Sequence, residues 1–167
     1  DANTFGSEAF YDVAVGSTNE IYVTGDASAS SPGNNLNFGN GKVFVLNNNH
    51  FIVAKYNDSG VCQWVDGSSS GGNAFGRSIV TDAGGAKVYV AGYITAGNVA
   101  VQGETFDENV DLAFLAAYDV SGGDIWGAAE HLSTDDGTPV NDFRVSDMIV
   151  LADGNIAISG YFQGTCD

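Results

Sequence analysis

Hydrophobic residues occur in short runs that repeat along the chain. Each run spans five or six residues, most of them apolar, β-branched or aromatic, and Gly, Asn, Asp and Ser fill the gaps between runs. This pattern is typical of β-strands, because branched and aromatic side chains pack well on a pleated surface. In the first part of the chain it predicts strands at 10–15, 21–25, 51–56 and 61–65. No long window has the apolar spacing that predicts a helix.

Short polar segments connect the first strand to the second and the third to the fourth. They are Gly16–Asn19 and Asn57–Gly60, with Asp82–Gly85 and Asp119–Gly123 at the matching places further on. Asp and Asn side chains close tight turns, and Gly adopts the left-handed conformation that such turns require. Connections this short predict that neighbouring strands run antiparallel.

The same pattern occurs two and a half times. Gly25, Gly92 and Gly160 stand at matching places, at intervals of 67 and 68 residues. A period of this length suits one sheet of a radial or stacked β array. We therefore expect a first sheet within 1–72, a second within 73–140 and the first half of a third within 141–167.

Two long connections, 27–49 and 95–110, join the second strand of a repeat to the third and share almost no sequence. In a four-stranded meander these connections leave the sheet at the same end as the connections between repeats. The variable residues are therefore expected at one end, opposite the tight turns. Loops on a rigid scaffold are where function usually resides.

Two motifs of the repeat resemble those of secreted seven-bladed β-propeller proteins. The first, aliphatic-Tyr-aliphatic-x-Gly, stands at Ile21–Gly25 and Val88–Gly92, with Ala157 replacing Tyr in Ile156–Gly160. The second is an aliphatic strand followed by Gly and Trp, at Phe51–Trp64 and Phe114–Trp126. The resemblance implies an all-β fold of four-stranded antiparallel blades.

Two and a half blades would form an incomplete ring, because propellers normally close with at least four. We therefore expect either that the chain belongs to a longer polypeptide or that several copies complete a ring or filament. Open sheet edges favour such association. A β-sandwich is the alternative fold.

The chain is strongly acidic, with 21 acidic residues against five basic ones and a net charge of −16. This charge repels phosphate, so nucleic acids and anionic membrane surfaces are poor partners. Proteins, neutral glycans and cations remain as partners, and solubility in a salty or calcium-rich medium is another explanation of the acidity. No apolar run approaches membrane-spanning length, so we expect no membrane insertion.

The chain begins with Asp1 and carries one glycosylation sequon at Asn57, which together favour a secreted or cell-surface protein. Its two cysteines, Cys62 and Cys166, are too few for a disulfide scaffold and lack metal-ligand spacing. The resemblance places them in sheets that are not neighbours, so we do not expect them to pair.

Acidic residues gather in two of the variable segments. One group is Glu104, Asp107, Glu108 and Asp111, and the other contains Asp135 and Asp136, flanked by Glu130 and Asp142. Calcium requires six to eight oxygen ligands, which such segments can supply, although neither has EF-hand spacing. Calcium is therefore the candidate cofactor, and a solvated acidic surface is the alternative.

The propeller resemblance implies that the first strand of each blade lines a central channel. Asp12, Ser78 and Asp147 then occupy matching positions, with Arg77 beside Ser78. Two carboxylates and a base around a channel can bind a cation or polarise a substrate. The alternative is a channel with solvated polar walls.

Large aromatic residues also recur at matching positions, as the pairs Trp64 and Trp126, and Tyr56 and Tyr118. Recurrence favours packing between neighbouring sheets, and stacking on a sugar is the alternative. His50 and His131 lie in no zinc-binding pattern, and no nucleophile elbow or phosphate-binding loop is present.

These observations favour a secreted structural or interaction module that displays variable acidic loops or assembles through sheet edges. A calcium-dependent carbohydrate-binding or carbohydrate-active propeller is the alternative. No catalytic residue is assigned.

Overall fold

The protein is all-β, as the sequence predicts. The computed structural model describes residues 5–29, 33–69, 71–95, 97–108, 111–130 and 143–162, and these form fourteen strands without a helix. Consequently, none of the described residues belongs to a helix that is able to span a membrane.

The first sheet has four antiparallel strands in the order β1–β2–β5–β6. They are β1 (Phe5–Val15), β2 (Ile21–Ala29), β5 (Asn49–Tyr56) and β6 (Cys62–Gly67). All four expected strands are present, and β1 and β2 extend several residues beyond the expected ranges. Asn19 and Gly60 adopt positive φ values of 63° and 75° in the two tight turns, which explains the preference for Asn and Gly there.

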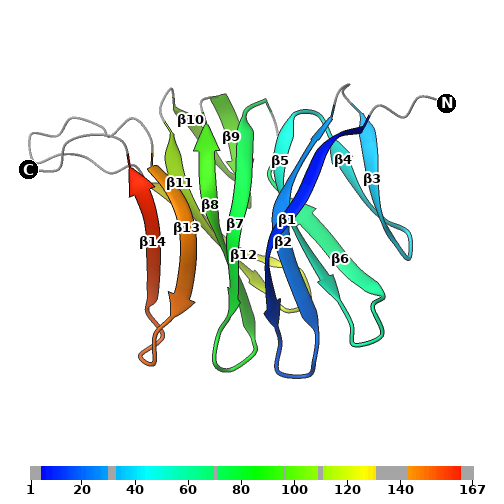
Figure 1. Ribbon diagram of the computed structural model, residues 1–167, viewed down its shortest axis with the longest axis vertical. Coiled ribbons are helices and arrows are strands. Elements are labelled where there is room, and N and C mark those ends of the chain that lie inside the picture. The colour runs from blue at the N-terminus through cyan, green and yellow to red at the C-terminus, as the bar shows by residue number, and fades with distance from the viewer. Residues whose placement is uncertain are drawn as a thin grey trace, which may run out of the picture.

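The second sheet repeats this arrangement and a third contains two strands (Figure 1). The second comprises β7 (Asn73–Thr81), β8 (Lys87–Thr95), β11 (Leu112–Asp119) and β12 (Asp124–Glu130), and the third comprises β13 (Phe143–Val150) and β14 (Ile156–Phe162). The expectation of four-stranded antiparallel sheets is confirmed for the first two repeats.

The long connections are not irregular loops, which corrects the expectation for 27–49 and 95–110. Each contains a β-hairpin, formed by β3 (Asn34–Gly39) with β4 (Lys42–Leu46) and by β9 (Gly97–Val101) with β10 (Glu104–Glu108). Their tight turns have positive φ at both central residues, Asn40–Gly41 and Gln102–Gly103. This conformation matches the twist of hairpin strands.

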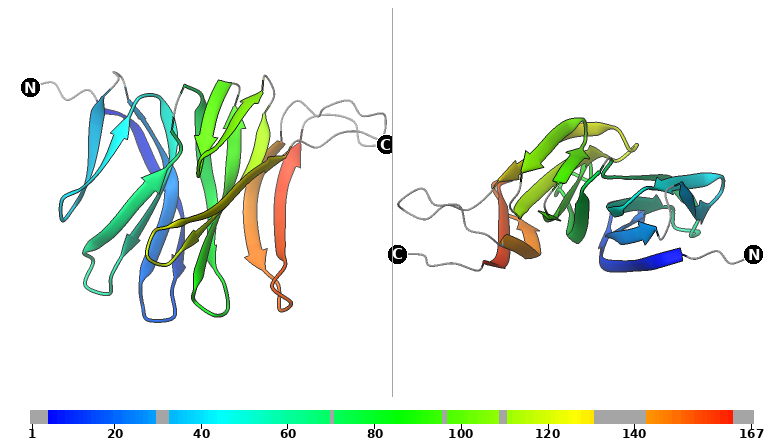
Figure 2. Two further views of the ribbon diagram at one scale, coloured as in Figure 1. Left: turned by 180° about the vertical axis from the view of Figure 1, so that it is seen from behind. Right: turned by 90° about the horizontal axis from the view of Figure 1, so that it is seen from above.

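The three sheets stand side by side, with their first strands along one side of the molecule (Figures 1 and 2). β7 contacts both β1 and β13, while β6 and β12 form outer edges of their sheets. Both extra hairpins begin at the end opposite the tight turns, but the β3–β4 hairpin folds back along the first sheet (Figure 1). At its tip the side-chain amide of Asn40 donates to the carbonyl of Cys62 at 3.0 Å, so the variable residues are only partly gathered at one end.

Two apolar layers hold the sheets together. Tyr22 and Val53 of the first sheet pack with Val90 and Phe114 of the second, and all four are buried. The layer between the second and third sheets includes Tyr89 and Met148. Tyr22 and Tyr89 occupy matching positions, so each sheet uses the same face to contact the next one.

Each first strand contains a one-residue irregularity at the same place. It falls between Phe10 and Asp12 in β1, between Gly76 and Ser78 in β7, and between Val145 and Asp147 in β13. The residue opposite is Gly25, Gly92 or Gly160, where a Cβ would overlap a carbonyl oxygen of the first strand. The recurring glycine therefore permits this close approach between backbones.

His50 anchors the end of the β3–β4 hairpin. Its side chain is almost fully buried, and its Nε2 accepts hydrogen bonds from the N–H groups of Asn47 at 3.2 Å and Asn48 at 3.3 Å. The other ring nitrogen, Nδ1, lies 3.3 Å from the hydroxyl of Ser68. The imidazole is therefore neutral with its proton on Nδ1. Burial lowers the pKa of His50 below its usual 6.5.

Mildly acidic conditions are expected to destabilise the protein through His50. At pH values between the lowered pKa and about 6.5, the unfolded chain binds a proton that the folded chain does not. The free energy of unfolding therefore decreases as the pH is lowered, by up to about 1.4 kcal/mol per pH unit. We expect His50→Gln to flatten this dependence in urea denaturation at pH 5 to 7.5. An unchanged slope would show that His50 is not its source.

Candidate functional site

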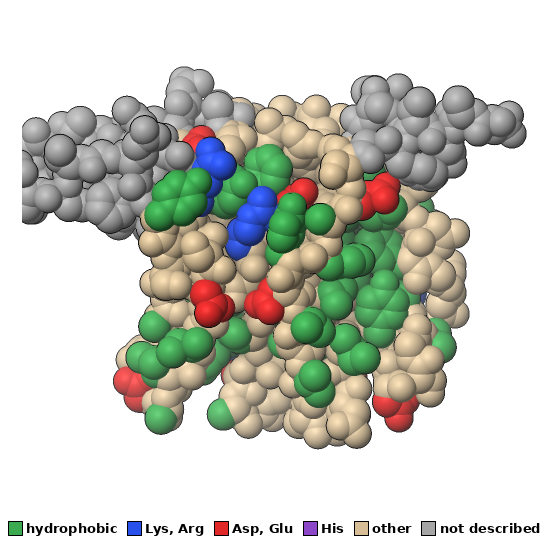
Figure 3. All heavy atoms as spheres, viewed as in Figure 1, with side chains coloured by type: hydrophobic (Ala, Val, Ile, Leu, Met, Phe, Trp, Pro, Cys, Tyr) green, Lys and Arg blue, Asp and Glu red, His purple; other side chains and the backbone are tan. Residues whose placement is uncertain are grey.

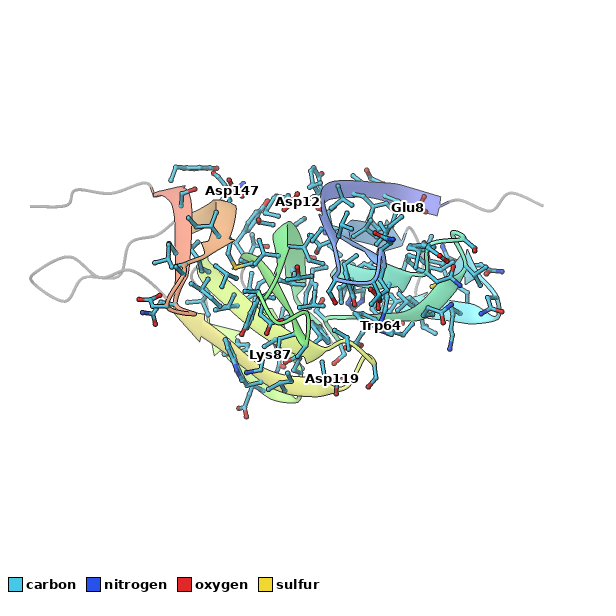
Figure 4. All side chains as sticks on the ribbon, turned by 90° about the horizontal axis from the view of Figure 1, so that it is seen from below. Glu8, Asp12, Trp64, Lys87, Asp119 and Asp147 are labelled. Carbon is cyan, nitrogen blue, oxygen red and sulfur yellow. The ribbon has the colours of Figure 1, made fainter. Side chains whose placement is uncertain are left out.

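The three matching first-strand residues lie close together. The hydroxyl oxygen of Ser78 lies 2.9 Å from Asp12 Oδ2 and 3.2 Å from Asp147 Oδ1, and Ser78 is buried. Asp12 and Asp147 lie on the same side of the molecule (Figure 4). Residues from three separate sheets thus form one polar cluster.

The carboxylates of the cluster accept hydrogen bonds from backbone N–H groups next to the strand irregularities. Asp12 Oδ1 accepts the N–H of Val13 at 2.8 Å, and Asp147 Oδ1 accepts that of Met148 at 2.8 Å. The second strand has Ser78 instead of an aspartate, and the N–H of Ile79 donates to Asp12 Oδ2 at 2.8 Å. Asp12 therefore accepts hydrogen bonds from the backbones of both β1 and β7 and links the two strands.

This geometry favours a structural link over a metal site. In the part of the chain that the structure describes, no three His, Cys, Asp or Glu side chains are grouped to hold a metal ion. The cluster borders an open hollow of about 440 Å³, whose walls are mainly aliphatic side chains of β1, β7 and β13. Two carboxylates with backbone partners match the hydrogen-bonding needs of the strands.

Substitution of Asp12 is expected to loosen the contact between the first two sheets. Asp12→Ala leaves the N–H of Ile79 without its acceptor and should lower the free energy of unfolding by about 2 kcal/mol, since bonds to charged groups contribute more than neutral ones. Chemical denaturation measures the change. Asp58→Ala, in an exposed turn, is the control, and equal losses for both variants would contradict the assigned role.

Arg77, next to Ser78 in β7, contacts residues outside the aspartate cluster. It occupies the irregularity of β7, and its guanidinium donates to Asp26 at 2.7 Å and to the hydroxyl of Tyr93 at 2.9 Å. Burial disfavours the charged form, but the bonds to Asp26 and Tyr93 outweigh it and raise the pKa of Arg77.

The guanidinium of Arg77 also stacks on aromatic rings. It lies 4.0 Å from the centre of the Tyr11 ring and 5.0 Å from that of Tyr93, and Arg144 lies 5.0 Å from the same Tyr93 ring. In Figure 3 the basic side chains of this face lie among apolar ones, with carboxylates beside and below them. Alternating cations and rings thus bridge all three sheets.

The structure describes some of the residues predicted to bind calcium and leaves that prediction open. Glu104, Asp107 and Glu108 lie in β10, a strand rather than a loop. Asp111 is 3.7 Å from the guanidinium of Arg144, an ion pair within the protein. Glu130 ends β12. Asp135, Asp136 and Asp142 lie outside the described residues.

Trp64 joins the first sheet to the second. Its ring lies 6.1 Å from that of Tyr22 in its own sheet and 5.9 Å from that of Tyr118 in the next. Its indole N–H donates to the carbonyl of Val120 at 3.2 Å. A Cβ on Gly122 would lie 2.7 Å from the indole, so the ring rests on the bare backbone of this glycine. We call this contact of Trp64 with Tyr118, Val120 and Gly122 the tryptophan latch.

Charged groups reinforce the latch. Lys55 Nζ donates to the same Val120 carbonyl at 2.9 Å and lies 3.3 Å from a carboxylate oxygen of Glu20. Figure 4 shows Trp64 beside Asp119, on the side of the molecule opposite Asp12. The first two sheets are therefore tied at both their inner and outer strands.

Each open end of the array carries half of a latch. Trp126 matches Trp64 and lies 6.4 Å from Tyr89, but its side chain is 40% exposed. The Tyr56–Gly60 turn matches Tyr118–Gly122, with equivalent hydrogen bonds from Ser59 N–H to Asn57 Oδ1 and from Ser121 N–H to Asp119 Oδ1. No described atom lies within 4 Å of a Cβ built on Gly60. The packing role predicted for the tryptophans is thus seen at Trp64.

A second hollow lies on the open face of the first sheet. It has a volume of about 400 Å³ and lies between the sheet and the β3–β4 hairpin. The residues that line it include Glu8, Phe10, Asp26, Phe38 and Tyr56, and the Asp26 carboxylate itself is paired with Arg77. Sequence reasoning missed this site because the hairpin that forms one wall was not predicted. The Asn40–Gly41 pair between alternating apolar residues was the available signal.

Two other sequence features lie around the first sheet. The side-chain oxygen of Asn57 accepts the N–H groups of Ser59 and Val61, so the sequon forms an ordered turn. Cys62 is buried in the edge strand β6, and burial raises the pKa of its thiol. Cys166 lies outside the described residues.

Comparison with known proteins identifies no relatives: no family model matches this sequence, and no curated protein is significantly similar to it.

Proposed function

We propose that the chain is a secreted or cell-surface structural or interaction module, built of propeller-type sheets that extend by stacking on further sheets. The supporting observation is that both stacking contacts use matching positions in the same direction. Tyr22 contacts the second sheet as Tyr89 contacts the third. A β-sandwich pairs two facing sheets, whereas this array continues in one direction.

The two ends of the array expose the two halves of this stacking contact. Ile79 and Met148 follow the irregularities of β7 and β13 at matching positions, and each is buried under the preceding sheet. Val13 is the matching residue of β1 and is 58% exposed. At the other end Ile149 matches Ala14 and Val80, which pack against a following sheet, yet it is 53% exposed.

A second copy of the chain fits these ends in head-to-tail order. The first sheet of one copy would follow the third sheet of another, so that Val13 covers the face that carries Ile149. Head-to-tail contacts generate rings or filaments. The net charge of −16 opposes association between copies, so assembly should strengthen as salt screens the repulsion.

Sedimentation velocity over a range of protein and salt concentrations tests this proposal. We expect assemblies that are multiples of 17.3 kDa and that dissociate in Val13→Asp. Val61→Asp is the matched control, because Val61 is also exposed but lies in a turn of the first sheet. A monomer under all conditions, or equal assembly of Val13→Asp and wild type, would contradict stacking.

Glycan binding is a second candidate, supported by the hollow beside the β3–β4 hairpin. Glu8 and the aromatic residues Phe10, Phe38 and Tyr56 line it, a combination that suits sugar hydroxyls and apolar sugar faces. The hollow lies on the open face of the first sheet, so a bound glycan and a stacked copy would compete. Titration with neutral oligosaccharides, with and without calcium, should show binding that Phe38→Ala abolishes. Absence of binding would remove this candidate.

A further inference from the structure

The third sheet lacks partners where the first two sheets have them. β14 matches β2 and β8, each of which lies between two strands, but among the described residues β14 pairs with β13 alone. Its Ile158 is 39% exposed. The unpaired side of β14 is therefore an open edge with exposed apolar side chains, which can accept an additional strand.

Trp126 is exposed beside the same vacancy. The Trp64 indole is covered by the turn after the third strand of the following sheet, Tyr118–Gly122. The described residues supply no such turn to Trp126, and its side chain is 40% exposed. One missing hairpin thus accounts for the open edge of β14 and for the exposed indole.

We propose that the β14 edge and Trp126 bind a β-hairpin that has the sequence pattern of the repeat's own second half. This inference rests on the proposed stacking function and specifies the partner for one end. The incoming strand carries a tyrosine at or next to its last position, followed four residues later by a glycine. In the first two sheets this tyrosine is Tyr56 or Tyr118, opposite Ile21 or Val88.

The observed latch defines what this partner must provide. By the same register, its tyrosine lies opposite Ile156 and stacks on the indole of Trp126. The glycine adopts positive φ, as Gly60 and Gly122 do at 75° and 95°, and presents its bare backbone to the ring. The carbonyl two residues earlier accepts the indole N–H, as that of Val120 does. A helix or an irregular loop would leave the N–H and C=O groups of β14 unpaired.

The second half of the first repeat provides a soluble probe. A fluorescein-labelled peptide of residues 50–66, with Cys62→Ser and Trp64→Phe, contains the strand, turn and return strand but no tryptophan. Fluorescence anisotropy measures its binding to the full chain. We expect saturable binding that Trp126→Ala weakens by about 30-fold or more, because buried tryptophans dominate interface energies. Ile125→Ala is the control, since Ile125 is the adjacent, equally exposed residue of β12.

Two peptide variants test the latch without altering the protein. L-alanine at position 60 places a methyl group toward the indole and should weaken binding by about 10-fold or more. D-alanine has the same composition, accepts positive φ and should bind like the parent peptide. Failure of the parent peptide to bind, equal affinity for Trp126→Ala, or equal affinity of the two alanine peptides would each overturn the inference.

Failure of the hairpin-binding inference can be distinguished from failure of the stacking proposal. The Val13→Asp variant leaves β14 and Trp126 unchanged, so it should bind the peptide normally. A protein that sediments as a monomer but binds the peptide through Trp126 would disprove head-to-tail stacking while supporting the hairpin site.

Discussion

Gly92→Ala is expected to lower the free energy of unfolding by about 4 kcal/mol or more, among the largest effects of a single substitution. A Cβ at this position overlaps the carbonyl oxygen of Phe75 and lies 2.7 Å from the ring of Phe114. The oxygen belongs to the backbone of β7, so relief requires separation of two paired strands. Urea denaturation followed by circular dichroism measures the loss.

Gly71→Ala is the matched control for this substitution. No described atom lies within 4 Å of a Cβ at Gly71, and its φ is not in the left-handed region. Its stability should stay within about 0.5 kcal/mol of wild type. Gly25→Ala should resemble Gly92→Ala, because the same overlap occurs with the carbonyl of Ala9. Equal stabilities of Gly92→Ala and Gly71→Ala would refute the role of the recurring glycine.

Trp64→Ala should lower the free energy of unfolding by about 3 kcal/mol or more, within the range for large aromatic residues. The substitution removes the ring contacts with Tyr22 and Tyr118 and the hydrogen bond to the Val120 carbonyl. It also leaves a cavity between the first two sheets. Thermal and urea denaturation should both report the loss.

Trp126→Ala serves as the internal comparison, because Trp126 occupies the matching position in the second sheet. It is 40% exposed and has no latch partner among the described residues, so its loss should cost less than about 1 kcal/mol. Similar losses for the two tryptophans would mean that the latch contributes little to stability.

Strand positions and sheet pairing could be predicted because they depend on local pattern. Apolar runs and turns such as Asn57–Gly60 determine which segments pair and in which direction. The β3–β4 and β9–β10 hairpins were missed because their sequences differ between repeats and the search relied on similarity. The Asn40–Gly41 turn carried a local signal that did not require similarity.

For the candidate site, the sequence could predict which residues of the three repeats occupy matching strand positions. Repeat alignment placed Asp12, Ser78 and Asp147 at one position, and adjacent first strands bring them together. The contacts of Arg77 with Asp26 and Tyr93 were not predictable, because an extra residue in a strand changes which way its side chain points, and only the pairing with β8 reveals it. The hydrogen bonds that Asp12 accepts from the backbones of β1 and β7 likewise could not be predicted from the sequence.

The acidic segments show why composition alone is a weak guide to a metal site. Glu104, Asp107 and Glu108 are close in sequence, and the structure places them in the strand β10 rather than in a loop. Asp111 forms an ion pair with Arg144, which the sequence did not indicate. Net charge predicted a repulsion from polyanions but not the location of any ligand.

The central claim is that neighbouring sheets are joined through the tryptophan latch. A double-mutant cycle for Trp64→Ala and Tyr118→Ala, from urea denaturation of the two single variants and the double variant, tests it most directly. We predict a coupling free energy of about 1 kcal/mol or more, because the two rings are in contact across the sheets. Additive losses, with a coupling near zero, would contradict the stacked arrangement.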